Sequence, residues 1–556
     1  MPRTPSNPTS RETIAAMAED RIGRASAFLA SGTIVSRILG FVKTIVLTAT
    51  IGMVGSGANA FAIATQLPNT IYAIVGGGVL SAVLVPQIVR ASRSADGGEK
   101  YINKLVTVAL VILAAVAVIA TLAAPLLTLL YGPRLDDETR QLATLFAFWS
   151  LPQIFFYGLY SVLGEVLNAK RSFGPFTWVP VINNLVGIGG MLVFAFIFGA
   201  DPGGSRSPSE WTAGMIALLA GATTVGVALQ ALTLFWFWKR IGLRFRPDFG
   251  WRGVGLGAAG KIAGWTFGML LLTTFAGIVE TGVSGGAADT GDPSVAALNN
   301  AWLIFMLPHS VITVSIATAY FTRMSEHAAI ADVDRVRADL SSALRGIGSI
   351  IVIATAVIMV VAYPFGAVYG LGDLENIAAF GNIVIAYLIG LIGFSALFVV
   401  QRTFYSLNDT KTPFFFTLFQ VVLFTAGALY AGTLPTSQIA LAIALTTTVA
   451  GTAQLILAAL LLRRKLRGID LRHVLGSYLR FIAAAIIPVA AGIGLLVLLG
   501  GTTDGGFALE TRVGAIISMI VIGGTMALLY FATLWFARVP EFRGFAEAVI
   551  MKLRRR

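Results

Sequence analysis

The stretch SGTIVSRILGFVKTIVL, residues Ser31 to Leu47, combines an apolar sequence with two basic residues. It lies in an apolar run suited to crossing a membrane, yet it contains Arg37 and Lys43 and no acidic residue. An ionised side chain at the centre of a bilayer costs roughly 2.5–3.5 kcal/mol on insertion scales. A membrane helix that keeps two cations therefore needs a source of negative charge.

The composition of the whole chain is typical of a polytopic membrane protein. Of its 556 residues 56% are hydrophobic and only 12% are charged, whereas about a quarter of the residues in a soluble domain are charged. The chain has no cysteine, which excludes disulfides and thiol chemistry, and its three histidines lack a metal-binding spacing. We therefore expect no metal and no cofactor. We attribute the net charge of +13 to basic cytoplasmic loops and expect no nucleic-acid partner.

Fourteen stretches of about 20 or more mostly apolar residues predict an all-α protein with about 14 transmembrane helices. They lie near residues 27–51, 61–89, 105–131, 141–167, 176–199, 211–238, 257–281, 296–322, 346–370, 378–401, 414–434, 437–462, 478–500 and 512–537.

The basic residues predict the orientation of these helices. Of the 40 Lys and Arg residues, 34 lie in or beside the two termini and alternate loops. The opposite loops have only Arg134, Arg140, Arg206 and Arg512. Cytoplasmic loops carry the excess of positive charge, so the alternation predicts an even number of spans with both termini in the cytoplasm.

Two similar junctions indicate an internal duplication. LNAKRSFGPF begins at Leu167 and LNDTKTPFFF begins at Leu407, 240 residues later, and both follow a predicted helix on the cytoplasmic side. This predicts two parallel six-helix lobes, an architecture of transporters. We expect a cytoplasmic tail at 1–26, an N-terminal lobe at 27–240, a C-terminal lobe at 253–463, two further helices at 477–537, and an amphipathic basic tail at 538–556.

The first predicted helix has a polar sector along its length. Arg37 lies ten residues into the helix, about 15 Å deep. At 100° per residue two neighbouring stripes form, one of Thr33, Arg37, Thr44 and Thr48 and the other of Ser36, Lys43 and Thr50. Such a sector predicts that the helix faces a cavity. For Lys43, and less so for the deeper Arg37, a side chain that reaches up to the lipid headgroups remains an alternative.

No acidic residue compensates these cations near the middle of the predicted helices. Glu165 and Glu280 both lie close to helix ends. We therefore expect a net positive cavity, which suits a phosphate or pyrophosphate group. On this interpretation the substrate supplies the negative charge.

The second predicted helix contains several breaks. Pro68 and the triplet Gly76, Gly77 and Gly78 favour bending, as alternating access requires, although close packing of small residues is an alternative interpretation. Farther along, in QRTFYSLNDTKTP (401–413), Asp409 is expected to cap the helix that follows.

Four segments together resemble the MurJ/MviN family, most closely its actinobacterial branch. They are SGTIVSRILGFVKT, NAFAIATQLPNTIYAIVGGGVLSAVLVPQIVRA, LNAKRSFGPFTWVPVINN and RTFYSLNDTKTP, in this order. The family contains lipid II flippases of bacterial peptidoglycan synthesis, within the multidrug/oligosaccharidyl-lipid/polysaccharide exporter superfamily. The resemblance implies a V-shaped pair of lobes around a cationic cavity, with a groove for a polyprenyl tail at helices 13 and 14.

The chain departs from the family pattern at several cavity positions. The residues that replace commonly charged ones are Thr44, Asn59, Tyr72, Gly77, Leu303 and Met306. The two cations of the first helix remain.

The resulting hypothesis is a flippase, not an enzyme, that moves lipid II from the inner to the outer leaflet of the bacterial cytoplasmic membrane by alternating access. Arg37 and Lys43, beside Ser36 and Thr44, would hold the pyrophosphate. The candidate sugar contacts are Asn59, Gln66, Asn69 and Tyr72, and the candidate hinge is Gly76, Gly77 and Gly78. The expected partners are a polyprenyl-pyrophosphate-linked glycan, membrane lipids and the cell-wall synthesis machinery.

Four alternatives remain open from the sequence. One is a flippase for another polyprenyl-linked glycan. A drug/cation antiporter would need an acidic residue inside a lobe, and the sequence indicates none. A membrane glycosyltransferase would need a carboxylate cluster at one membrane face. A cell-wall scaffold that transports nothing would account for the missing cavity charges.

Overall fold

The computed structural model describes residues 10–80, 99–170, 172–240, 242, 245–250, 260–370, 372, 374–539 and 541. All regular structure in these residues is helical, and 13 helices are long and apolar enough to cross a membrane. The all-α polytopic fold is therefore confirmed. The remaining predicted helix, 61–89, begins as α2 and continues into residues outside the described ones.

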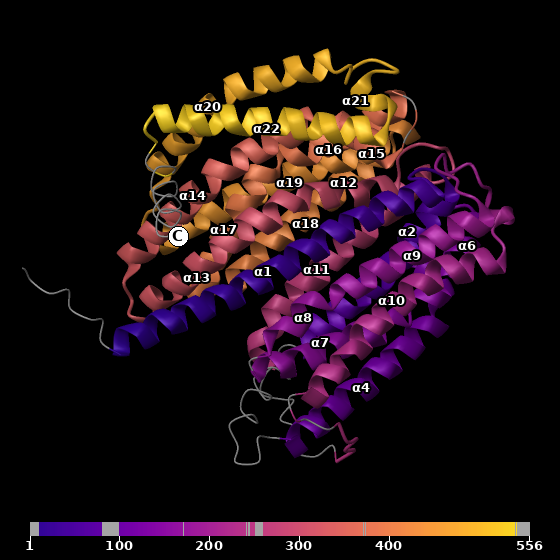
Figure 1. Cartoon of the computed structure of the whole chain (residues 1–556), viewed down its shortest axis with the longest axis horizontal. Coiled ribbons are helices and arrows are strands. Elements are labelled where there is room, and N and C mark those ends of the chain that lie inside the picture. Colours follow the sequence, from indigo (N-terminus) through magenta and orange to yellow (C-terminus); the bar gives the residue numbers. More distant parts are fainter. Residues whose placement is uncertain are drawn as a thin grey trace, which may run out of the picture.

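Two groups of helices follow one another along the chain (Figure 1). After the long helix α1 (Ser10–Ile51), the N-terminal bundle comprises α2 (Ser56–Tyr72), the π-helix η1 (Ala73–Leu80), α4 (Glu99–Leu122), α5 (Ala124–Tyr131), α6 (Asp137–Ser150), α7 (Gln153–Ala169), α8 (Phe173–Trp178), α9 (Pro180–Phe198) and α10 (Ala213–Arg240).

The C-terminal bundle comprises α11 (Gly260–Ser284), α12 (Val295–Pro308), the π-helix η4 (His309–Thr313), α13 (Val314–Ala329), α14 (Val333–Val360), α15 (Ala362–Tyr369), α16 (Leu374–Ile389), α17 (Leu391–Ser406), α18 (Lys411–Ala431) and α19 (Thr436–Lys465). Two further long helices, α20 (Leu471–Leu498) and α22 (Arg512–Phe536), pack against each other and against α14 and α15 (Figure 1).

The apolar surface of the molecule indicates contact with lipid. Large side chains such as Phe196, Leu498 and Phe536 are more than four-fifths exposed. Exposed apolar patches of this kind mark membrane contact, and helices are stable in lipid because their backbone groups are paired within the helix.

The helix α1 runs between the two bundles (Figure 1). It packs along α8 and α9 of the N-terminal bundle. On its other side the Phe41 ring meets the rings of Phe365 and Tyr369 on α15 edge-on, at 6.1 and 6.2 Å between centroids. Residues on α1 are thus placed to face either bundle.

Each bundle contains a helix with the same kind of irregularity. Leu67-Pro68 in α2 and Leu307-Pro308 in α12 lie 240 residues apart, the separation of the two junction sequences. Each pair precedes a π-helical segment, η1 and η4 respectively. A proline removes one helical hydrogen bond, and π-helical turns often occur at functional sites.

The junction before α18 folds as its sequence predicts. The Asp409 carboxylate accepts hydrogen bonds from the backbone N–H of Thr412 at 2.9 Å and from its hydroxyl at 2.8 Å. It also pairs with Lys465 at the end of α19, at 2.5 Å. Burial alone would raise the pKa of Asp409, but these bonds outweigh it, and the pKa lies below its usual value.

Candidate substrate cavity

A cavity of about 650 Å³ lies in the C-terminal bundle. It is lined by residues of α11, α12, α16, α17, α18 and α19, with Gln66 of α2 from the N-terminal bundle. Its volume falls in the range of roughly 300–1,000 Å³ that is usual for ligand pockets. Many of the lining side chains bear a hydroxyl or an amide. Among the described residues that line the cavity, Glu280 is the one acidic side chain, and none is Lys, Arg or His.

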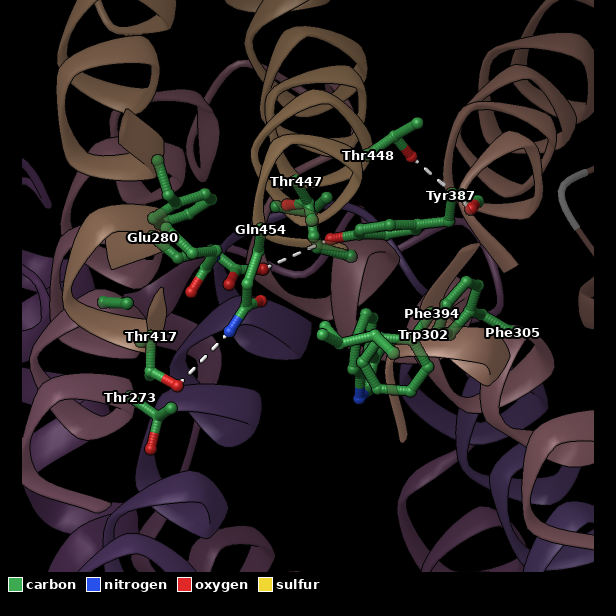
Figure 2. A pocket seen from close by; sticks show the side chains of 18 of the residues that line it. Thr273, Glu280, Trp302, Phe305, Tyr387, Phe394, Thr417, Thr447, Thr448 and Gln454 are labelled. Atoms are coloured by element: carbon green, nitrogen blue, oxygen red, sulfur yellow. Dashed lines mark hydrogen bonds between the residues drawn. The ribbon is translucent and has the colours of Figure 1, made fainter. Parts of the chain in front are cut away.

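Glu280 corrects one inference from the sequence. Although it lies only four residues before the end of α11, its side chain faces this cavity, where the Tyr387 hydroxyl donates to Glu280 Oε1 at 3.3 Å (Figure 2). The expectation that no acidic residue lies inside a lobe is therefore wrong. The spacing of Thr266, Thr273 and Glu280, seven residues apart on one helix face, is the sequence signal that marks them as cavity residues.

An aromatic group forms another wall of the cavity. The Trp302 ring stacks on Phe305 at 4.7 Å with an interplanar angle of 21°. The rings of Tyr387 and Phe394 approach Trp302 edge-on, at 5.5 and 6.0 Å. Figure 2 shows Trp302, Phe305 and Phe394 on the side opposite Glu280 and Thr417. One wall is thus apolar and the other polar.

Arg37 faces the C-terminal bundle from α1. Its Nη1 donates a hydrogen bond to Ser310 Oγ in η4, and the Ser310 hydroxyl donates to Leu307 O at 3.0 Å. Ser310 comes eight residues after Trp302, about 12 Å farther along the helix. The guanidinium is exposed rather than packed away, so it remains accessible to an anion.

Lys43 points in a different direction. Its side chain lies over Gly187 of α9, where an added Cβ would come within 2.8 Å of Lys43 Cε and 3.2 Å of Nζ. Gly187 is 11 residues from the end of α9, so Lys43 does not reach up to the headgroups. The structure therefore does not bring Lys43 and Arg37 together in one site.

The neighbours of these cations bond within α1 itself and to α9 of the N-terminal bundle. Ser36 O accepts a hydrogen bond from Asn184 Nδ2 at 2.9 Å. The Thr44 hydroxyl donates to Gly40 O in its own helix at 3.1 Å. The polar stripe of α1 is thus partly satisfied by the helix and by α9.

Of the four candidate sugar contacts, Gln66 is the one that lines the cavity, and its Oε1 accepts from the Thr281 hydroxyl at 3.2 Å. Asn69 is exposed and donates to Thr65 O within its own helix, at 2.9 Å. The Tyr72 ring lies 5.8 Å from the Tyr157 ring of α7. These contacts place Tyr72 against the N-terminal bundle.

Asn59 lies instead at a contact between the bundles. It is fully buried, and its Nδ2 donates to Ala288 O at 3.3 Å while its Oδ1 accepts from Ala296 N at 3.0 Å. With both ends of its amide bonded to the chain, Asn59 is not available to a sugar in this conformation.

A second contact closes the same end of the molecule, which we call the outer end because the distribution of basic residues predicts that it lies outside the cell. Asp289, in the loop after α11, accepts hydrogen bonds from the hydroxyls of Ser56 at 3.1 Å and Thr139 at 2.7 Å. Both donors belong to the N-terminal bundle. The sequence gives no sign of this pairing, because the three residues come from separate loops and helices.

The candidate hinge coincides with the π-helix η1. An added Cβ on Gly76 would come within 2.4 Å of Tyr72 Cε2, so this glycine permits close approach of the ring. Gly77 and Gly78 lie in the same π-helix. Among the described residues no group of three or more His, Asp or Glu side chains is arranged to hold a metal ion.

Solved structures with this fold include two transporters of known type. A structure of lipid II flippase MurJ in an inward closed conformation aligns over 91% of this chain and 99% of its own, with a TM-score of 0.68 and 18% identity. An inward-facing multidrug resistance MATE family transporter of the MOP superfamily aligns over 78% of this chain and 94% of its own, with a TM-score of 0.58 and 15% identity. At these identities the likeness shows the fold.

Sequence comparison gives the family. The chain is 24% identical over 423 residues to a probable lipid II flippase MurJ of Rickettsia prowazekii, covering 72% of this chain and 76% of that protein. It is 25% identical over 407 residues to a probable lipid II flippase MurJ of Synechocystis, covering 72% and 74%. The family model described as lipid II flippase MurJ matches residues 22–514. The chain therefore belongs to the MurJ lipid II flippase family.

Proposed function

We propose that this protein moves lipid II across the bacterial cytoplasmic membrane, from the inner to the outer leaflet. The observation that carries the proposal is the position of Arg37. It lies deep in a membrane helix between the two bundles, accessible to an anion and bonded to an uncharged serine. A pyrophosphate bound there would supply the missing negative charge, and a planar guanidinium binds phosphate oxygens in a bidentate manner.

Transport would proceed by alternating access between the bundles. The hydrogen bonds of Asn59 and Asp289 hold the outer end closed in this conformation. The π-helices η1 and η4 lie in corresponding helices and are the natural places for bending. Release of the outer contacts would open the cavity toward the other leaflet.

The proposed topology places both termini in the cytoplasm, with the two bundles acting as parallel six-helix lobes. The excess of basic residues in alternate loops supports the orientation. The spacing of 240 residues between Leu67-Pro68 and Leu307-Pro308 supports the duplication. The substrate would be a polyprenyl-pyrophosphate-linked glycan, with membrane lipids around the bundle and the cell-wall synthesis machinery as protein partners.

A second candidate substrate is another polyprenyl-linked glycan. It is favoured by the uncharged residues Tyr72, Leu303 and Met306 at positions where the family commonly carries charge. Both substrates share the pyrophosphate, so Arg37 would have the same role.

Depletion of the protein in its host tests the function and separates these substrates. We expect lipid II to accumulate in the inner leaflet, measured as the fraction protected from a membrane-impermeant headgroup reagent. Accumulation of a different polyprenyl-linked glycan, with lipid II distributed normally, would favour the second candidate. No change in either distribution would contradict the proposal.

A further inference from the structure

We infer that the cavity of the C-terminal bundle binds the neutral, hydroxyl-rich sugar portion of the substrate, with Trp302 as a stacking surface and Glu280 as an acceptor of hydrogen bonds from sugar hydroxyls. The inference deepens the proposed function and rests on it, because it takes the substrate to be a lipid-linked glycan.

The charge of the cavity excludes the phosphate portion of such a substrate. None of the described residues that line it is Lys, Arg or His, so this cavity offers a phosphate no positive charge. A phosphate placed here would lose its hydration without a cation to compensate it, which is unfavourable. A neutral group rich in hydroxyls meets no such penalty.

The aromatic wall supplies a flat apolar surface. Phe305 stacks on one face of the Trp302 ring, and the rings of Tyr387 and Phe394 contact Trp302 edge-on. These contacts fix the orientation of the Trp302 ring. Trp302 remains 37% exposed and lines the cavity. A pyranose ring has an apolar C–H face of similar size, and a rigid aromatic plane buries such a face at little entropic cost.

The opposite wall supplies hydrogen-bonding groups. Figure 2 shows Glu280, Gln454 and Thr417 on this side, with Gln454 Nε2 donating to Thr417 Oγ1 at 3.2 Å. A carboxylate accepts bonds from hydroxyl donors, whereas amides and hydroxyls both donate and accept. A sugar between the two walls would stack on one side and form hydrogen bonds on the other.

Arg37 and the cavity are spaced to hold two parts of one molecule. Ser310, which accepts from Arg37, lies about 12 Å along the helix from Trp302. An anionic group at Arg37 and an adjoining sugar beside Trp302 would therefore be bound together. The order of the two sites would set the orientation of the headgroup.

A competing occupant of an acidic cavity is a small cation. The two differ in what they require of residue 280. A sugar hydroxyl can bond to an amide oxygen, so Glu280→Gln should keep most of the sugar affinity, whereas Glu280→Leu should lose it. A cation needs the negative charge and would be lost in both variants.

Calorimetric titration of the purified full chain with two probes tests the inference. The probes are a neutral N-acetylhexosamine disaccharide and inorganic pyrophosphate. Trp302→Ala should weaken disaccharide binding about thirtyfold, the loss typical of truncating an aromatic anchor, and Trp302→Phe should weaken it less. Pyrophosphate binding should be unchanged in both variants, which also shows that they are folded. Arg37→Ala should show the reverse pattern.

Trp236→Ala, on α10 outside the cavity, is the matched control and should bind both probes as the unmodified protein does. The inference is overturned if the unmodified protein does not bind the disaccharide, or if Trp302→Ala binds it normally. It is also overturned if the cavity binds a cation instead. In that case sodium chloride would give a binding signal that Glu280→Gln abolishes, and the disaccharide would give no signal. Disaccharide binding as expected, in a protein that does not move lipid II, would contradict the proposed function and leave the sugar site standing.

Discussion

For Arg37 and Lys43 a helical wheel predicts their angular positions on the helix but not the residues that they contact. They lie six residues apart, which sets them about 120° apart around α1. Depth and polarity follow from the sequence alone, but the neighbours on each side do not. In the structure Arg37 bonds to Ser310 of the C-terminal bundle, while Lys43 lies over Gly187 of the N-terminal bundle. Of these two cations, Arg37 is therefore the one that faces the proposed path of the pyrophosphate.

Replacing Arg37 tests this assignment. Arg37→Ala should lower transport about tenfold or more, the effect of losing a charged hydrogen bond worth roughly 1.5–3 kcal/mol. Arg37→Lys should keep part of the activity, since the charge stays and the planar fork is lost. The measurement is growth of a depleted strain that expresses each variant at matched membrane levels. Full complementation by Arg37→Ala would exclude the role.

Gly76 is the candidate hinge residue whose surroundings are defined. Gly76→Ala should slow transport, because its Cβ would collide with the Tyr72 ring unless the ring or the π-helix shifts. Gly189→Ala on α9, where an added Cβ meets nothing within 4 Å, is the control. Adding Tyr72→Ala to Gly76→Ala should restore activity in the same growth assay. Normal growth of the single variant would mean that the glycine is not needed for movement.

At the scale of elements, the apolar runs predict the described helices well, because about 20 apolar residues in lipid have few structures other than a helix. The cap at Asp409 is predicted for a similar reason, since the capping bonds are local. Contacts between distant elements are not predicted. Glu280 in the cavity and Asn59 against Ala288 depend on how α2, α11 and the following loop meet.

Breaking the hydrogen bonds of Asp289 at the outer end should open the cavity toward the outside. Asp289→Ala removes the acceptor for the hydroxyls of Ser56 and Thr139. The outward-open population should therefore rise severalfold, as expected from the net free energy that such hydrogen bonds contribute to the closed state. A cysteine at Asn299, which lines the cavity, should then react faster with an external, impermeant maleimide. The chain has no cysteine of its own, so the background is low.

Asp292→Ala is the matched control for this experiment. Asp292 lies in the same loop, but its carboxylate accepts a hydrogen bond from Thr290 of that loop. Its removal should leave the labelling rate at Asn299 unchanged. Equal rates in the Asp289 and Asp292 variants would show that Asp289 does not hold the outer end closed.

The topology of the whole chain can be tested with reporters on two segments that are expected on opposite sides of the membrane. Reporters fused after Arg556 and inserted after Gly291, in the exposed loop that follows α11, should label opposite sides of the membrane, with the C-terminal one in the cytoplasm. The expectation follows from the basic loops, which make one orientation favourable. Labelling of both reporters on the same side would contradict the predicted topology of fourteen helices.

Transport of lipid II with Arg37 at the pyrophosphate can be measured with the purified protein in vesicles that carry labelled lipid II in one leaflet. We expect transfer to the other leaflet at a rate well above that of protein-free vesicles, and a rate lowered about tenfold or more by Arg37→Ala. Transfer no faster than in protein-free vesicles, or transfer at the same rate with Arg37→Ala, would contradict this expectation.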